Sequence, residues 1–197
     1  MSKKPTISTN LSIIIFVGMF GGLLILMGYK LCDMGYFGKA GSMPVYGEVP
    51  PFTLTEKSGA SLNSLDLKGK LWVADFMFTR CAGQCPMMSL KMKGLAKQFP
   101  KATFVSFTSD PEYDTPEVLA TYASWYKADP KQWLFLTGEK EEISKIAQGL
   151  KFSRLDSPDM HSNYFVLVDA KEQVRGYYDV NDKDAMNKLK TDIKKLL

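Results

Sequence analysis

Two closely spaced cysteines are the residues of this 197-residue chain best suited to chemistry. Cys81 and Cys85 stand in the run Cys-Ala-Gly-Gln-Cys-Pro, which ends at Pro86. Thiols at this spacing can bind one metal ion or form a disulfide, provided that the backbone curls and brings the α carbons within about 7 Å. The single histidine, His161, lies far downstream before a strand-like run. A site of two sulfurs and one imidazole is therefore compatible with the sequence.

The segments around the cysteines predict where each thiol lies. Residues 71–78 form an apolar run typical of a central strand, and Pro86 suits the first turn of a helix. The expected unit is strand, cysteine loop and helix. A thiol at a helix N-terminus meets partial positive charge, so we expect the thiolate of Cys85 to be favoured over the thiol.

The number of soft ligands favours a particular kind of metal. Structural zinc normally takes four protein ligands, whereas Cys81, Cys85 and His161 supply three. Three soft donors suit Cu(I). Zinc with an open fourth position is an alternative for the same residues. A structural disulfide is an alternative for the cysteine pair, but its loop position before a helix favours a functional pair.

The N-terminal segment is expected to anchor the chain in a membrane. No charged residue lies between Lys4 and Lys30, and the apolar core at residues 11–29 approaches the roughly 20 residues that span a bilayer. A cleaved signal peptide is the alternative. Its apolar region would run over only about 7 to 15 residues and would end in a small-x-small site, for which residues 38–40 are a poor match.

The charge of the chain bears on its partners and its orientation. The formal net charge is +4, and without Lys3, Lys4 and Lys30 the chain keeps 22 basic and 21 acidic residues. This near-neutral body argues against a nucleic-acid-binding module. A weak basic bias favours an N-terminus inside the cell and a domain outside the cytoplasm, most simply in the periplasm beside a bacterial inner membrane. There a close cysteine pair can cycle through a disulfide.

A third cysteine, Cys32, makes the cysteine count odd. It lies directly after the predicted membrane span and follows residues 29–31, which do not match the small residues usual before a lipidated bacterial cysteine. We expect an unpaired thiol near the membrane surface, with a lipid anchor as the alternative.

The predicted organisation is a membrane anchor at residues 1–34, a linker at 35–51 and one domain at 52–197. Glycines and prolines recur through the linker, which favours irregular structure. The remaining length is sufficient for one domain with a core of its own.

Strands and helices alternate through the predicted domain, which implies a layered α/β architecture. A thioredoxin-like sheet flanked by helices accounts for this order economically. The predicted strands are residues 52–54, 71–78, 102–107, 132–136, 163–169 and 174–178. Helices are predicted after Pro86, after Pro116, at residues 141–150 and towards the C-terminus at residues 186–196.

Two further groups of residues have ordinary structural interpretations. Three methionines near the cysteines resemble a copper-handling cluster, but the helical spacing of two of them favours core packing. An acidic run could hold a hard cation, but its neighbouring prolines favour a solvated turn with helix capping. The methionines are Met87, Met88 and Met92, and the acidic residues are Asp110, Glu112 and Asp114.

Taken together, these motifs resemble the Sco (SenC) family of membrane-anchored, thioredoxin-like copper chaperones of cytochrome c oxidase assembly. The resemblance covers roughly residues 45–195. It is carried by Asp-Phe-Met-Phe-Thr-Arg-Cys at residues 75–81, by Cys85-Pro86, by Ser-Asp-Pro-Glu-Tyr-Asp-Thr-Pro-Glu at 109–117, and by His161-Ser162 before the strand-like run. The family's copper ligands are two cysteines and a histidine, so the resemblance implies Cys81, Cys85 and His161 as ligands, with Cys81 and Cys85 also able to form a disulfide.

The chain departs from the family pattern at three places. The first two remove no ligand, and the third argues against a carboxylate contribution to Cu(II) binding. Ala82 stands where the family often has proline, and residues 170–173 replace a glycine-containing turn. Met160 separates Asp159 from His161, where the family often places an acidic residue directly before the histidine. We expect Met160 to pack rather than to bind copper.

The resemblance implies a metallochaperone, a carrier rather than an enzyme. It would pass copper to the copper-bearing subunit of cytochrome c oxidase or to another copper chaperone. The alternative is a thiol-disulfide oxidoreductase in which Cys81 and Cys85 reduce the cysteines of a partner. A thiol peroxidase is a third interpretation. His161 distinguishes the first two, because copper binding requires it and disulfide exchange does not.

Overall fold

The computed structural model describes residues 18–28, 30, 43–151 and 163–197. The chain divides into two units, Met1–Met43 and Pro44–Leu197. Residues 18–28 of the first unit are helical. In the described part of the chain, no helix has both the length and the apolar character needed to cross a bilayer. The predicted span at residues 11–29 lies partly outside the described residues, and a transmembrane helix stays a prediction.

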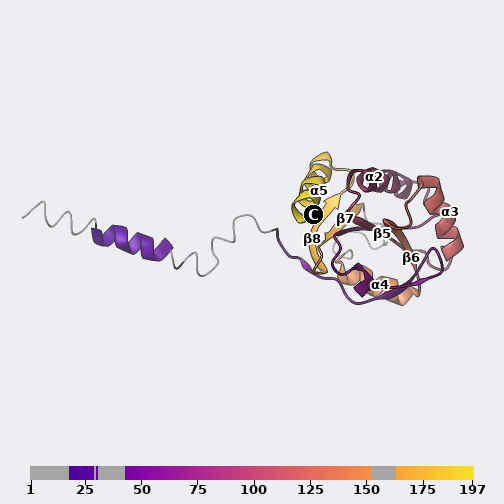
Figure 1. Cartoon of the computed structure of the whole chain (residues 1–197), viewed down its shortest axis with the longest axis horizontal. Helices are drawn as coiled ribbons and strands as arrows, with labels where there is room; N and C mark the ends of the chain where they lie inside the picture. The colour runs from indigo at the N-terminus through magenta and orange to yellow at the C-terminus, as the bar shows by residue number, and fades with distance from the viewer. Residues whose placement is uncertain (1–17, 29, 31–42, 152–162) are drawn as a thin grey trace, which may run out of the picture. The chain divides into compact units, whose positions relative to one another are not determined.

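The second unit is built on a mixed sheet with the strand order β1-β8-β7-β4-β5-β6-β2-β3 (Figure 1). In its centre β4, β5 and β6 run parallel, and β7 is antiparallel to β4. The strands are β1 (Gly47–Glu48), β2 (Thr53–Glu56), β3 (Ser61–Asn63), β4 (Trp72–Met77), β5 (Thr103–Thr108), β6 (Trp133–Thr137), β7 (Tyr164–Val168) and β8 (Gln173–Asp179).

Helices cover both faces of this sheet. Figure 1 shows α4 on one side of the sheet and α2 and α3 on the other. This arrangement is the one expected when strands alternate with helices along the chain. The helices are α2 (Gln84–Gln98), α3 (Pro116–Tyr126), α4 (Lys140–Gly149) and α5 (Lys183–Leu196), with a short 3-10 helix η1 (Ser64–Leu67) after β3.

Strand β4 is buried on both faces, which suits its central place. Successive side chains of a strand point to opposite faces, so β4 contributes to two cores. Trp72, Ala74 and Phe76 belong to the core that contains Ile143 and Ile146 of α4. Asp75 therefore points to the opposite face, which α2 and α3 cover.

The predicted alternation of strands and helices is confirmed between β2 and α5, with ends that shift by a few residues. The sequence patterns missed β1, β3 and η1. These elements are two to four residues long, too short to show a hydrophobic period. Strand β1 lies within the predicted linker at residues 35–51 and pairs antiparallel with β8 through backbone hydrogen bonds, which need no apolar pattern.

Candidate functional site

The two cysteines lie in and directly after the connection between β4 and α2. Cys81 is in the loop and Cys85 is in the first turn of α2. The helix has Gly83 as its N-cap, which offers no side chain to accept a hydrogen bond. Instead, the backbone N–H of Cys85 donates to the Sγ of Cys81 at 3.4 Å. Both cysteines are free thiols, and the Cys81 sulfur takes the place of a capping oxygen.

The hydrogen bonds at this helix start lower the pKa of Cys81. Burial is the largest single effect and by itself would raise the pKa of this thiol. Hydrogen bonds from the Cys85 thiol and from the backbone of residues 83–85 outweigh it. Such donors stabilise the thiolate more than the thiol. Cys81, which is partly exposed, is therefore the sulfur of the pair that ionises more readily.

Cys85 behaves in the opposite way, and the prediction that its thiolate is favoured is wrong. Its side chain is only 4% exposed, and burial raises its pKa to about 12, with a further contribution from its hydrogen bond to Cys81. The physical reason is that the backbone N–H groups at the helix start and the Cys85 side chain point in different directions. The N–H groups of the first turn point out of the helix towards Cys81, whereas the Cys85 side chain points inward, where a charge is poorly solvated.

Asp75 is the buried acid nearest in sequence to the cysteine loop. It is 0% exposed, and neither of its oxygens has a hydrogen-bond partner in the described structure. Burial raises its pKa to about 7, and the neighbouring Ser106 hydroxyl offsets part of that rise. When ionised, Asp75 adds to burial in raising the pKa of Cys85. A negative charge on Asp75 thus disfavours a negative charge on Cys85, and the reverse also holds.

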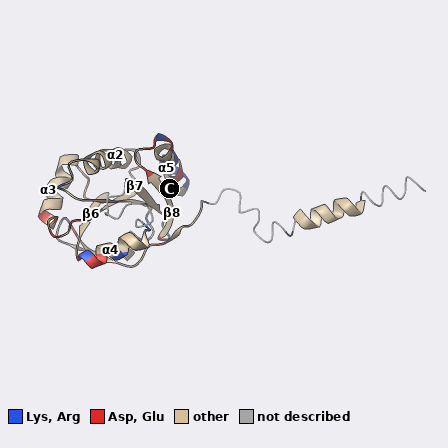
Figure 2. Ribbon diagram, turned by 180° about the vertical axis from the view of Figure 1, so that it is seen from behind, with Lys and Arg blue, Asp and Glu red and all other residues tan. Residues whose placement is uncertain are grey.

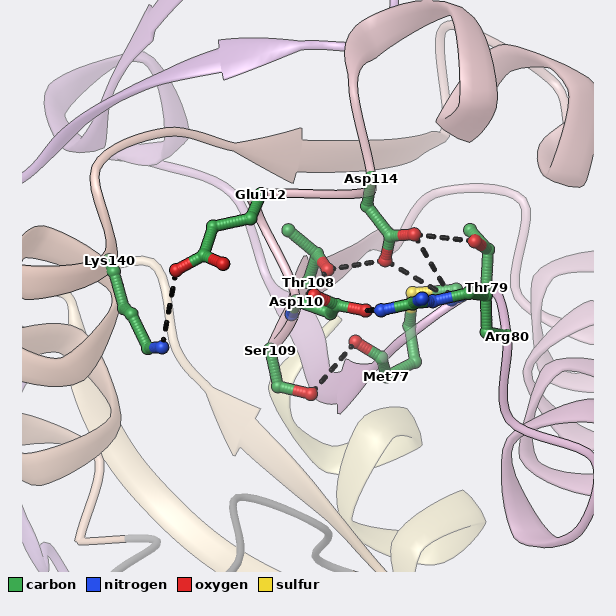
Figure 3. Close-up of polar contacts among 9 residues, drawn as sticks. All are labelled: Met77, Thr79, Arg80, Thr108, Ser109, Asp110, Glu112, Asp114 and Lys140. Atoms are coloured by element: carbon green, nitrogen blue, oxygen red, sulfur yellow. Dashed lines mark hydrogen bonds and ion pairs between the residues drawn. The ribbon is translucent and has the colours of Figure 1, made fainter.

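A second buried acid, Asp114, holds the cysteine loop in place. Figure 3 shows its carboxylate between Thr79 and Thr108. The backbone N–H of Thr79 donates to Oδ2 at 3.1 Å, the Thr79 hydroxyl donates to Oδ1 at 2.5 Å, and the Thr108 hydroxyl donates to Oδ2 at 2.5 Å. Asp114 lies before α3 and Thr79 lies two residues before Cys81, so this carboxylate connects the end of β5 to the cysteine loop.

The other two acidic residues of this run form ion pairs with basic side chains. Asp110 forms an ion pair with Arg80 at 2.5 Å, and Glu112 forms one with Lys140 at 3.5 Å (Figure 3). The predicted turn with helix capping is confirmed, since the Thr115 side chain caps α3. The prediction of a solvated turn is wrong for Asp114, which is buried and accepts hydrogen bonds from the two threonines.

The methionines follow the prediction of core packing. Met88 and Met92 are 1% and 0% exposed on the inner side of α2. Met87, on the outer side, is 42% exposed. The two buried methionines pack in the core beneath α2.

The third predicted ligand, His161, lies outside the described residues, as do Met160 and Cys32. The structure therefore brings together Cys81 and Cys85, and the place of His161 stays a prediction. Within residues 43–151 and 163–197, no three side chains of the His, Cys, Asp and Glu types gather into a metal-binding group.

Sequence patterns alone missed the roles of Asp75 and Asp114. A signal for Asp75 was available, because it is the one charged residue in the apolar run at residues 71–78. A carboxylate at such a place costs free energy unless it is neutral or paired. No comparable signal identified Asp114, because its partners come from a different strand and loop.

Comparison with known proteins places these features in a family. The SCO1/SenC family profile matches residues 44–197. The SCO1 protein homolog of Bacillus subtilis is 31% identical over 187 residues, which cover 90% of this chain and 94% of that protein.

Solved structures share the architecture. The structure of BsSco, described as having a disulfide switch and as a member of the Sco family of cytochrome c oxidase assembly proteins, is 30% identical with a TM-score of 0.69. The matched region covers 79% of this chain and 96% of the BsSco chain. Yeast Sco1 with copper bound is 25% identical with a TM-score of 0.60, covering 75% of this chain and 89% of its own. The fold is thus the thioredoxin-like α/β fold of Sco proteins.

The family profile spans the whole of the second structural unit, including β4, the cysteine loop and α2. The relative from Bacillus subtilis extends the likeness over nearly the full chain. This chain belongs to the SCO1/SenC family.

Proposed function

We propose that this protein is a copper metallochaperone that binds one copper ion through Cys81, Cys85 and His161 and delivers it to the copper centre of cytochrome c oxidase. The observation that carries the proposal is the pairing of a stabilised thiolate with a second thiol at the start of α2. Two sulfur ligands and one imidazole form a donor set that suits Cu(I). The copper-bound yeast Sco1 structure supports copper as the metal.

Sheet topology supports His161 as the third ligand. Strand β7 is antiparallel to β4, with Ala74 opposite Val166 and Trp72 opposite Val168. The first residue of β7, Tyr164, therefore lies at the end of the sheet from which the cysteine loop leaves. His161 precedes Tyr164 by three positions in the sequence. A short connection of this length can bring an imidazole to the cysteines.

A metal titration tests the proposal. The reduced full chain, purified in detergent, is titrated with Cu(I), Cu(II) and Zn(II) in the presence of a competing chelator. We expect one Cu(I) per chain, and binding that is lost when Cys81 and Cys85 are oxidised. A strong preference for zinc would contradict the assignment.

Variants then test the individual ligands. Cys81→Ser, Cys85→Ser and His161→Ala should each weaken copper retention, because each removes one of three donors. Cys32→Ser is the matched control, since it removes a thiol outside the proposed site. Unchanged copper affinity in His161→Ala would refute the three-ligand site.

The pKa difference between the cysteines favours a second candidate function, thiol-disulfide exchange. The Cys81 thiolate would attack a partner's disulfide, form a mixed disulfide and release one partner thiolate. Cys85, after losing its proton, would then attack the Cys81 sulfur. This step forms the Cys81–Cys85 disulfide and releases the second partner thiol, so that two electrons pass to the partner.

This exchange can be separated from copper carriage. Cys85→Ser should trap the mixed disulfide through Cys81, because the resolving thiol is missing. His161→Ala should reduce a model disulfide at the rate of the unaltered chain while it loses copper. A His161→Ala chain that loses both properties would argue against two separable functions.

We also infer that the chain is anchored by its N-terminal apolar segment with the domain outside the cytoplasm. The uncharged stretch between Lys4 and Lys30 supports the anchor. The proposed partners are the copper-bearing subunit of cytochrome c oxidase or another copper chaperone, and the description of BsSco as an oxidase assembly protein supports the first. Protease protection in membrane vesicles of known orientation tests the topology.

A further inference from the structure

A groove of about 570 Å³ runs between α2 and α5. Both helices border it with one stripe of residues at three- and four-residue steps, the spacing that places side chains on one helix face. Lys91 and Leu95 belong to the stripe of α2, and Lys183, Met186 and Lys190 belong to that of α5. The groove thus has two helical walls.

One end of the groove meets the cysteine loop. Gln84, which directly precedes Cys85, donates from Nε2 to Oδ1 of Asn181 at 3.0 Å. Asn181 lines the groove. The α2 stripe that contains Lys91 also continues towards the N-terminus of the helix. It passes through the exposed Met87 to Gln84, in steps of four and three residues. A segment lying in the groove would therefore reach the start of α2, where the cysteine loop ends.

The residues that the structure describes along this groove make it basic. Three lysines line it, and none of its lining residues is acidic. Lys91 donates to the backbone carbonyl of Val180, which fixes its ammonium group at the groove. Lys183 and Lys190 form no ion pair with any residue of the described structure, in contrast to Lys188, which binds Asp192. Figure 2 shows the basic positions of α5 in blue.

We propose that this groove is the docking site for an acidic, partly apolar segment of the protein that exchanges copper or electrons with Cys81 and Cys85. The inference rests on the proposed function, which requires such a partner. Uncompensated lysines at a concave surface attract a segment of opposite charge and orient it during encounter. Met87 and Met186 add apolar contact, and the contact with the cysteine loop explains why docking would serve exchange.

The same charges fit a peptide segment better than an anionic membrane. A bilayer is flat and cannot follow a groove between two helices. Asp182 and Asp184 are exposed at the start of α5, where a flat anionic surface would meet them. Neither carboxylate is among the residues that line the groove.

A binding titration with two synthetic peptides tests the proposal. Both are fluorescent, cysteine-free and equal in length, with leucine alternating with glutamate in one and with glutamine in the other. The full chain in uncharged detergent should bind the glutamate peptide about tenfold or more tightly than the glutamine peptide at low salt. High salt should remove most of this difference, because it screens exposed charges.

Variants locate the binding. Lys183→Glu combined with Lys190→Glu should weaken binding of the glutamate peptide by about tenfold or more, because two attractive charges become repulsive. Gly94→Gln offers a second, uncharged test, since Gly94 lines the groove and a side chain there meets open space. It should weaken binding severalfold while favouring the helix. Lys97→Glu is the matched control, because this exposed α2 residue lies outside the groove lining.

Three results would overturn the proposal. The first is equal loss of peptide binding in Lys97→Glu and in the groove variants. The second is photo-crosslinking of the glutamate peptide to residues outside α2, α5 and the cysteine loop. The third is loss of binding to phosphatidylglycerol vesicles, but not to the peptide, in the groove variants. Copper titration of each variant tests the docking groove separately from the proposed copper site, because the groove variants should bind copper as the unaltered chain does.

Discussion

The backbone N–H of Cys85 donates a hydrogen bond to the Sγ of Cys81, so the cysteine inside α2 stabilises the sulfur outside it. The two thiols are therefore unequal, although they are only four positions apart. The helix start lowers the pKa of Cys81 even against the effect of burial, while burial raises the pKa of Cys85. Because the thiolate is the form that binds metal and attacks disulfides, we expect Cys81 to react first in either of the proposed functions.

The first prediction concerns alkylation of the unaltered, reduced chain. Iodoacetamide should modify Cys81 at least about tenfold faster than Cys85 at neutral pH, because each pKa unit changes the thiolate fraction tenfold. Peptide mapping by mass spectrometry measures both rates in one sample. The rate at Cys81 should fall as the pH is lowered through its pKa. Equal rates at the two cysteines would contradict the assigned asymmetry.

The second prediction concerns the buried carboxyl of Asp75. Burial raises its pKa from near 3.8 to about 7, so the folded chain keeps a proton that the unfolded chain releases above about pH 4. Its contribution to stability is full below the unfolded pKa and is lost as the pH rises through the folded pKa. At pH 8, the free energy of unfolding of Asp75→Asn, measured by urea titration, should therefore exceed that of the unaltered chain by up to about 4 kcal/mol. Near pH 4 the two chains should be about equally stable.

The control for Asp75→Asn is Glu48→Gln, which neutralises an exposed carboxylate on β1. This control should shift the free energy of unfolding little at any pH, because exposed charges are well solvated. If Asp75→Asn parallels the unaltered chain from pH 4 to pH 8, then Asp75 is already charged or already neutral throughout that range, and the prediction is wrong.

The third prediction concerns the support of the cysteine loop by Asp114. Asp114→Ala leaves the Thr79 N–H and the hydroxyls of Thr79 and Thr108 without their acceptor. We expect a loss of about 3 kcal/mol in the free energy of unfolding, since hydrogen bonds to a buried carboxylate are strong. Faster amide hydrogen exchange at residues 79–81 should accompany it.

A matched control for that loss lies two positions earlier. Glu112→Ala removes an exposed carboxylate whose ion pair with Lys140 is 3.5 Å long. It should cost less than about 1 kcal/mol, as surface ion pairs usually do. Losses of equal size in the two variants would mean that Asp114 does not support the loop.

The fourth prediction concerns removal of copper. Binding to the folded state alone stabilises it by about 2.7 kcal/mol when free ligand exceeds the dissociation constant a hundredfold. Loading with Cu(I) should therefore raise the melting temperature of the reduced chain, and a Cu(I) chelator should return it to the starting value. Cys81→Ser combined with Cys85→Ser should show no such shift, and a shift that survives in this variant would place the copper elsewhere.

Much of the fold could be predicted because its elements have strong local signals. Strand β4 is apolar except for Asp75, and α2 shows buried Met88, Met92 and Leu95 at helical spacing. Such periods depend on neighbours in the sequence and on burial alone. By contrast, β1 consists of two residues whose pairing with β8 depends on a strand more than a hundred positions away.

The sequence by itself determined which residues could do chemistry: a close cysteine pair before a helix, a single histidine, and motifs that identify the family. Only the tertiary structure decided which cysteine is the stabilised thiolate, because the directions of the Cys81 and Cys85 side chains depend on how α2 starts and packs. It also decided that Asp75 is fully buried beside Ser106 and that Asp114 holds Thr79. Side-chain pKa values and loop geometry depend on neighbours distant in the sequence, and only the folded chain brings those neighbours together.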